Sequence, residues 1–152
     1  MGSGKTSLGQ RLAAHLDRQF FDSDVSIERA TGRSGREIAE TDGVPALHDL
    51  ERETLLDSLA GHEPAVIAAA ASVVDDPGAR AALERVFCIW VRADPDILEE
   101  RASRGAHRRT VATSEHLERR DSIFAGLGDI VVDTGELSPE ETASRVLNEI
   151  RD

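Results

Sequence analysis

Apolar residues recur at helical spacing in three stretches of the chain. Leucines at every fourth position from Leu8 to Leu16 predict a helix over residues 5–17. Further leucines at the same kind of spacing predict a second helix over residues 46–60. Near the end of the chain, Ser138 opens the sequence S-P-E-E, which is typical of a capping box with proline in the first turn. We therefore expect a terminal helix that starts at this serine.

Short apolar runs separate these helices and have the length of buried strands. The runs cover residues 20–21, 65–68, 86–91 and 130–132. The run at 86–91 is apolar throughout, as expected for a parallel strand that is covered on both faces. Asp94 and Pro95 follow it as the N-cap and first residue of another helix. Strands that alternate with helices predict an α/β fold, a three-layer sandwich around a parallel sheet.

The chain lacks repeats, low-complexity segments and linkers, so we expect residues 1–152 to form a single domain. The segment 105–115 differs from the rest, because it has no apolar periodicity and contains His107, Arg108 and Arg109 among small residues. Such a segment between two helices predicts a mobile lid loop over a nucleotide. A plain surface connection with incidental arginines is the alternative.

Composition and charge exclude several classes of function. The net charge of −11 over 152 residues argues against a binder of nucleic acid polymers or anionic membranes, since both need a basic face. Cys88 is the single cysteine, which excludes an intrachain disulfide and fits a reducing, cytoplasmic compartment. No apolar stretch approaches the length of a membrane span. We expect small-molecule ligands and a monomer.

The first seven residues, M-G-S-G-K-T-S, match most of the phosphate-binding pattern G-x-x-x-x-G-K-[ST], whose backbone N–H groups surround phosphate oxygens. The residues expected to bind the nucleotide are Gly2, Ser3, Gly4, Lys5, Thr6 and Ser7. Lys5 would place a positive charge at the β- and γ-phosphates of ATP, and the Thr6 hydroxyl would be a ligand of Mg²⁺. The pattern's first glycine and the strand that normally precedes it are absent from the sequence, and a glycine-rich tail is the alternative interpretation.

Two carboxylates follow the first apolar run. Asp22 and Asp24 are two residues apart, so at the end of a strand they would point to the same face. Opposite a phosphate loop, one suits a magnesium ion and the other a substrate hydroxyl. Alone the pair is a weak signal, because strand ends are often acidic.

With these residues the chain resembles the shikimate kinases. The resemblance rests on the phosphate loop, on F-F-D-S-D-V-S-I-E-R-A-T-G from residue 20, on E-I-A-E-T-D-G from residue 37, and on V-V-D-T-G from residue 131. It implies a five-stranded parallel sheet of the nucleoside-monophosphate-kinase type. The strand before the phosphate loop is central in that sheet, so we expect this first central strand to be missing here and the natural gene to start upstream.

The resemblance also implies roles for individual residues. Lys5 and Thr6 match the phosphate lysine and the magnesium hydroxyl, and Asp22 matches the carboxylate near the magnesium ion. Asp24 matches the carboxylate that holds the substrate hydroxyls and favours deprotonation of the attacking one. Arg120 matches the arginine that binds the substrate carboxylate, and a solvated helix charge is its alternative role.

Several positions depart from the family pattern. The motif F-R-x-x-E becomes L-H-D-L-E at residues 47–51, so His48 replaces a second arginine for the substrate carboxylate. Three glycines that let the backbone approach the substrate become Ala70, Ala71 and Ser72. The lid motif R-P-L-L becomes R-R-T-V, in which Arg109 is expected to contact the nucleotide.

The sequence therefore predicts a divergent or degenerate member of the family that uses ATP and Mg²⁺ to phosphorylate a hydroxyl of shikimate or a related acceptor. Two alternatives stay open. One is a catalytically degenerate nucleotide-binding protein that acts through a partner. The other is a kinase for a different small acceptor, such as a polyol or a nucleoside.

Overall fold

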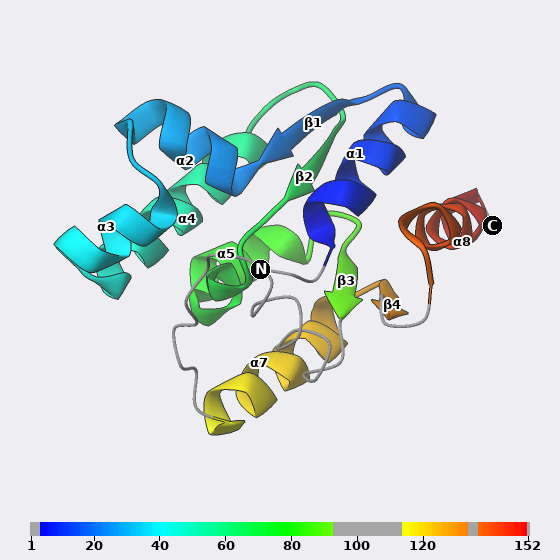
Figure 1. Ribbon diagram of the computed structural model, residues 1–152. Helices are drawn as coiled ribbons and strands as arrows, with labels where there is room; N and C mark the ends of the chain where they lie inside the picture. The colour runs from blue at the N-terminus through cyan, green and yellow to red at the C-terminus, as the bar shows by residue number, and fades with distance from the viewer. Residues whose placement is uncertain (1–3, 93–113, 134–136, 152) are drawn as a thin grey trace. The chain divides into compact units, whose positions relative to one another are not determined.

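The computed structural model describes residues 4–92, 114–133 and 137–151 (Figure 1). Contacts between residues divide the chain into two compact units, one formed by residues 1–11 and 87–152 and the other by residues 12–86. Helix α1 (Lys5–Leu16) contributes residues to both units. The expectation of a single domain stays a prediction.

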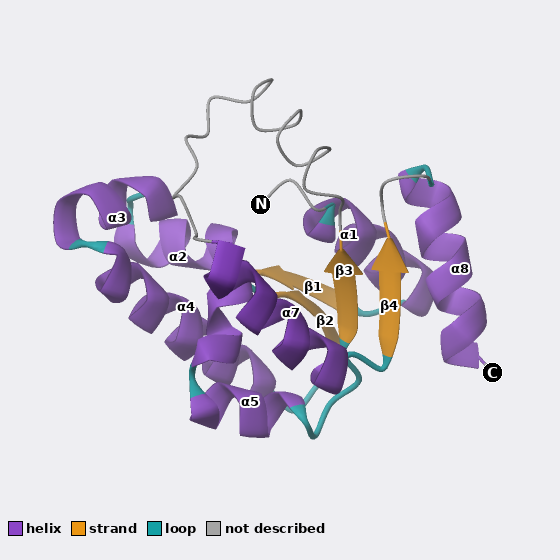
Figure 2. Cartoon of the chain, turned by 90° about the horizontal axis from the view of Figure 1, so that it is seen from below, coloured by secondary structure: helices purple, strands orange, loops and turns teal. Residues whose placement is uncertain are grey.

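The unit of residues 12–86 alternates helices with two strands. After α1, its elements are β1 (Gln19–Asp22), α2 (Ser23–Thr31), α3 (Gly35–Asp42), α4 (Val44–Leu59), β2 (Ala65–Ala68), the 3₁₀ helix η1 (Ala71–Asp75) and α5 (Pro77–Leu83). Strands β1 and β2 pair in parallel, with Gln19 opposite Ala65 and Asp22 opposite Ala68 (Figure 2). Both carboxyl ends therefore lie at the same edge of the pair, where β1 leads into α2 and β2 leads towards η1.

Helix α4 is the element against which most of this unit packs. It contacts α2, α3, η1 and α5. The apolar side chains buried in the unit come from these elements and from α1: Leu12, Ala13, Ile27, Ile38, Leu55, Val73, Val74 and Ala79. A buried Leu or Ile side chain contributes roughly 1.5–3 kcal/mol relative to an exposed one, so this core holds the carboxyl edge of β1 and β2 in place.

The other unit contains β3 (Ile89–Arg92), α7 (Ser114–Leu127), β4 (Ile130–Asp133) and α8 (Pro139–Arg151), together with the start of α1. Strands β3 and β4 also pair in parallel, with Ile89 opposite Ile130 and Arg92 opposite Asp133. Trp90 stacks on Phe124 of α7 with ring centroids 5.5 Å apart. Burial raises the pKa of the Cys88 thiol, and the negative charge of Asp129 raises it further.

The predicted parallel α/β architecture is confirmed, since helices alternate with strands and every described strand pairs in parallel. These described strands form two two-stranded sheets. The helices predicted at 5–17, 46–60 and after Ser138 correspond to α1, α4 and α8. Within the described ranges, no helix is both long and apolar enough to cross a membrane.

The strand predicted at 86–91 is wrong at its start. Strand β3 begins at Ile89, and Val86 and Phe87 are 41% and 56% exposed rather than covered on both faces. The N–H of Val86 donates to the carbonyl of Leu83, so the backbone is still completing the turn after α5. An apolar run alone does not distinguish such a turn from the strand that follows it. The helix expected from Asp94 lies outside the described residues.

A capping box starts α8, as the sequence S-P-E-E predicts. The Ser138 N–H donates to the Glu141 carboxylate at 2.8 Å, and the Glu141 N–H donates to the Ser138 hydroxyl at 3.2 Å. The hydrogen bond from the backbone of Ser138 lowers the pKa of Glu141, and the bond with the Ser138 side chain lowers it further.

This lowered pKa predicts a pH-dependent contribution to stability. A carboxyl group whose pKa is lower in the folded protein stabilises it above the unfolded pKa of about 4.3, and this contribution is lost as the pH falls through the folded value. We expect the melting temperature of Glu141→Gln to lie below that of the unchanged chain at pH 6, with the difference shrinking at pH 3. Thermal unfolding followed by circular dichroism measures it. A difference that stays constant down to pH 3 would contradict the assignment.

Candidate active site

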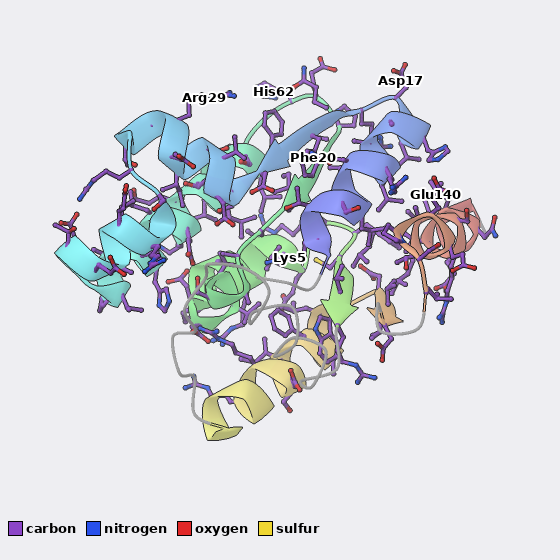
Figure 3. All side chains as sticks on the ribbon, viewed as in Figure 1. Lys5, Asp17, Phe20, Arg29, His62 and Glu140 are labelled. Carbon is purple, nitrogen blue, oxygen red and sulfur yellow. The ribbon has the colours of Figure 1, made fainter. Side chains whose placement is uncertain are left out.

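The start of α1 has the geometry of a phosphate site. Gly4 has a φ of 87°, a left-handed conformation that favours glycine, and its carbonyl accepts the Leu8 N–H at 3.0 Å. The helix then begins at Lys5 (Figure 3), and its first turn contains no acidic residue. The first N–H groups of a helix have no acceptor within it, and the helix dipole is positive at this end. The arrangement therefore favours an anion, and Lys5 and Thr6 stand where one would bind.

Several predicted nucleotide contacts lie outside the described residues. These are Gly2, Ser3 and Arg109. The same holds for residues 105–113 of the predicted lid, whereas residues 114 and 115 belong to α7. Of the remaining predicted contacts, Ser7 lies half-buried in the first turn of α1. The nucleotide-binding roles of all these residues stay predictions.

The interpretation of Asp22 and Asp24 as neighbours on one strand face is wrong. Strand β1 ends at Asp22, which is the N-cap of α2, and Asp24 lies in the first turn of that helix. The Asp22 carboxylate accepts the Asp24 N–H at 2.9 Å. Aspartate is a preferred N-cap because its side chain satisfies an N–H group of the first turn, and this preference starts the helix directly after the strand. The two residues still lie together at the carboxyl edge of β1.

The acceptor side of the predicted site lies on α4 and η1. His48 is half-buried on α4, and Ala71 is exposed at the start of η1. Next to them, the Ser72 hydroxyl of η1 donates to the Glu51 carboxylate of α4, and both residues are 8% exposed. Sequence reasoning assigned no role to Glu51, although the motif L-H-D-L-E contains it. Ser72 therefore takes part in a buried polar contact rather than only filling the space of a glycine.

The structure groups the predicted residues by unit. Lys5, Thr6 and Arg120 belong to the unit of residues 1–11 and 87–152, with Arg120 half-buried on α7. Asp22, Asp24, His48 and Ala71 belong to the unit of residues 12–86.

Oxygen donors that suit Mg²⁺ are present in both units. Thr6 provides a hydroxyl at the start of α1, and Asp22 provides a carboxylate whose Oδ1 also caps α2. Mg²⁺ prefers oxygen ligands and is usually bound by one or two protein groups together with water and substrate phosphates. The chemistry of these donors therefore fits the ion. No cluster of three or more His, Cys, Asp or Glu side chains suited to a metal occurs within the described part of the chain.

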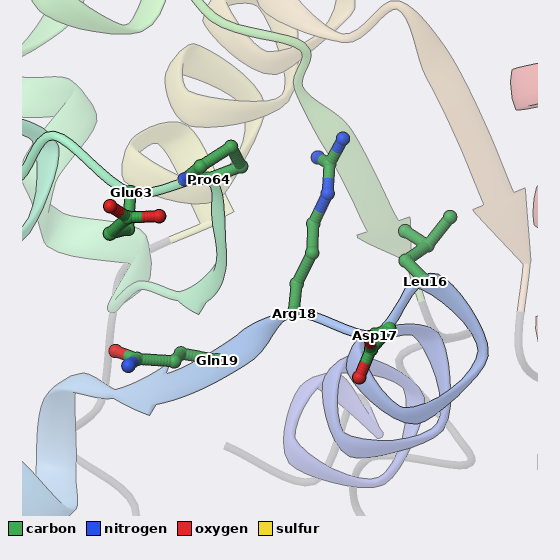
Figure 4. Close-up of a pocket in the computed structure, with 6 residues that line it drawn as sticks. All are labelled: Leu16, Asp17, Arg18, Gln19, Glu63 and Pro64. Carbon is green, nitrogen blue, oxygen red and sulfur yellow. The ribbon is translucent and has the colours of Figure 1, made fainter.

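A pocket of about 350 Å³ lies at the other edge of the β1 and β2 pair (Figure 4). It is lined by Leu16, Asp17, Arg18, Gln19, Glu63 and Pro64. Gln19 and Ala65 are the first paired residues of the two strands, so the pocket lies at their amino ends. Ligands of parallel α/β sheets bind at the carboxyl ends. This pocket is therefore separate from the predicted site.

Comparisons with known proteins support the same assignment. The family model for shikimate kinase matches residues 1–151. The shikimate kinase of Cereibacter sphaeroides is 33% identical over 153 residues, which cover 96% of this chain and 76% of the relative. The shikimate kinase of Zymomonas mobilis is 33% identical and covers 97% of this chain and 87% of its own length.

The fold comparison agrees. A shikimate kinase from Acinetobacter baumannii, solved in complex with shikimate, superposes with a TM-score of 0.89 over 99% of this chain and 88% of the other, at 24% sequence identity. The chain belongs to the shikimate kinase family. The predicted family, fold class and enzyme class, an ATP-dependent small-molecule kinase, are confirmed, and none of the comparisons favours either alternative function.

Nucleotide binding should depend on Lys5. Losing a charge-assisted hydrogen bond costs about 1.5–3 kcal/mol, so we expect Lys5→Ala to weaken ADP binding by roughly ten- to a hundred-fold. Isothermal titration calorimetry measures the affinity. Arg18→Ala is the matched control, because it removes one cation at the pocket on the opposite edge. An ADP affinity that Lys5→Ala leaves unchanged would contradict the phosphate site.

Proposed function

We propose that this chain transfers the γ-phosphate of ATP to a hydroxyl group of shikimate. The proposal rests first on the match to the shikimate kinase family model over residues 1–151. It is supported by the start of α1, where Lys5 and Thr6 follow the left-handed Gly4 in a geometry that favours an anion. A relative solved with shikimate supports the choice of acceptor.

The residues divide the work of phosphoryl transfer, which is mostly positioning and charge neutralisation. The first turn of α1 binds the phosphates, and the Lys5 ammonium offsets the charge that develops on them. The exposed Asp24 carboxylate, in the first turn of α2, orients the acceptor hydroxyl and takes its proton. The acceptor oxygen then bonds to the γ-phosphorus while the bond to the β-phosphate oxygen breaks and ADP leaves. Arg120 binds the acceptor carboxylate, and Arg109 contacts the nucleotide.

Thr6 and Asp22 would hold Mg²⁺, which when bound neutralises phosphate charge and orients the β- and γ-oxygens. We further infer a monomer that works in the cytoplasm on soluble metabolites. The single cysteine fits a reducing compartment and so supports the location, and the net charge of −11 disfavours polyanionic partners and so supports small-molecule ligands.

A coupled assay of ADP release tests the function. We expect ADP release from MgATP to rise when shikimate is added and to stay at the background rate without it. Phosphoshikimate should form in a 1:1 ratio with ADP, measured by mass spectrometry. ADP release that shikimate does not change would contradict the proposal.

Asp24 should matter more for turnover than Asp22 does. Positioned acid–base groups contribute on the order of 10²–10⁴-fold, so we expect Asp24→Asn to lower kcat by at least about 10²-fold. Asp22→Asn is the comparison, since asparagine is an equally good N-cap and keeps α2 in place. It should instead raise the Mg²⁺ concentration needed for half-maximal rate. Equal, small effects of both variants on kcat would show that the two residues only terminate the strand.

We expect this chain to bind shikimate more weakly than a variant with an arginine at position 48 would. One charge-assisted hydrogen bond corresponds to about ten- to a hundred-fold in affinity, and His48 lacks the permanent charge of an arginine. We expect His48→Arg to lower the KM for shikimate by only part of this range, because side chains at 70–72 also crowd the acceptor. His62→Arg, on the loop before β2 (Figure 3), is the control for added charge. A micromolar KM for shikimate in the unchanged chain would show that His48 does not weaken shikimate binding.

A further inference from the structure

Glu51 is a buried carboxylate with one hydrogen-bond donor. It is 8% exposed on the inner face of α4, and the Ser72 hydroxyl donates to its Oε2. No other hydrogen bond or ion pair of the Glu51 side chain occurs among the residues described. Burying a carboxylate is costly unless donors replace the lost water, so the position of Glu51 depends on this serine.

Arg52, the cation next to Glu51 in the sequence, forms its ion pairs with other carboxylates. The Arg52 guanidinium pairs with Asp49 at 3.2 Å, with Asp76 at 3.8 Å and with Glu53 at 3.9 Å. These partners hold Arg52 towards the side of α4 that meets the start of α5, because Asp76 is the N-cap of α5. Arg52 is therefore engaged elsewhere, and Ser72 remains the donor for Glu51.

Position 48 is the other place from which a donor could reach Glu51. Residues three apart on a helix share a face, so the side chains at 48 and 51 are neighbours on α4. His48 is half-buried, and its imidazole makes no hydrogen bond or ion pair with the described residues. An arginine at this position would offer five donors and a permanent charge on the same face as the carboxylate.

We propose that His48 and Ser72 are a coupled pair of specificity-determining positions, linked through Glu51. Ser72 is a positioning residue: its hydroxyl supplies the hydrogen bond that a cation at position 48 would otherwise supply. With Ser72 in place, Glu51 is held towards η1, and an arginine introduced at position 48 meets a carboxylate that is already engaged. An acceptor carboxylate is bound fully only when both positions change together. This inference rests on the proposed function for its choice of acceptor.

Thermal unfolding without any substrate tests the link through Glu51. Ser72→Ala is compared in the unchanged chain and in the His48→Arg background. We expect it to lower the melting temperature by about 5–10 °C in the former and by less than half as much in the latter, where arginine takes over as donor. Ser58→Ala is the control on the same helix, because its hydroxyl donates to the Thr54 carbonyl at 2.8 Å and not to Glu51. Its effect should be the same in both backgrounds, and an equal loss from Ser72→Ala in both would overturn the link.

Steady-state kinetics with shikimate tests the specificity. The proteins are the unchanged chain, His48→Arg, Ser72→Gly and the double variant. We expect kcat/KM of the double variant to exceed the product of the two single effects by about ten-fold or more, with the gain in KM rather than kcat. Independent single effects would overturn the specificity role.

The two measurements separate the inference from the function on which it rests. If the unchanged chain phosphorylates shikimate while neither measurement shows coupling, the inference fails and the function stands. If the melting temperatures are coupled while all four proteins fail to phosphorylate shikimate, the proposed function fails. In that case Ser72 still positions Glu51, and the pair has no role in shikimate specificity.

Discussion

The contact of the Glu51 carboxylate is the constraint that fixes η1 against α4. Its hydrogen bond with Ser72 joins α4 to η1, two elements that are far apart in the sequence. The ion pair of Arg52 with Asp76, at 3.8 Å, joins α4 to the start of α5, where the same Asp76 accepts the Ala79 N–H at 2.8 Å. Val73 and Val74 are buried between these two polar links. The chain after β2 is therefore attached to α4 on both sides of an apolar contact, which positions Ala71 at the carboxyl edge of the strands.

Helix starts create the other chemical features of the candidate site. At α1, the left-handed Gly4 lets the helix begin at Lys5, and no acidic side chain opposes an anion in the first turn. At α2 the side chains are acidic instead, because Asp22 caps the helix and Asp24 follows within its first turn. A helix start without acidic side chains favours the phosphates of a nucleotide, because its N–H groups and dipole attract anions. Lys5 and Asp24 thus each lie in the first turn of a helix, one after a left-handed glycine and the other after a capping aspartate.

Sequence patterns predicted correctly those helices in which the spacing of apolar residues matches the buried face or in which a capping motif marks the start. The leucine spacing of α1 places Leu8 and Leu12 in the core, and S-P-E-E forms the predicted capping box. The extension of the first strand beyond Asp22 to Asp24 was wrong, because an aspartate at the end of a strand can either continue it or cap a helix, and local sequence does not decide between them. Ser72 and Glu51 are 21 residues apart, and their contact depends on how η1 packs against α4. The spacing of residues along the sequence does not indicate such a contact. From the sequence, Ser72 was therefore interpreted only as a side chain that replaces a glycine close to the substrate.

The basic residues of this chain are almost all arginines. The chain has 18 lysines and arginines, and Lys5 is the only lysine. Arginines form ion pairs with carboxylates in the described part of the chain, for example Arg33 with Asp42 at 2.8 Å and Arg52 with its three acidic partners. A guanidinium has a planar set of donors that matches a carboxylate, whereas an ammonium is a compact charge on a flexible stem. Lysine accordingly binds phosphate as a point charge, whereas arginine suits bidentate contacts with carboxylates. The one ammonium side chain of the sequence therefore stands at the start of α1, where we propose that the phosphates bind.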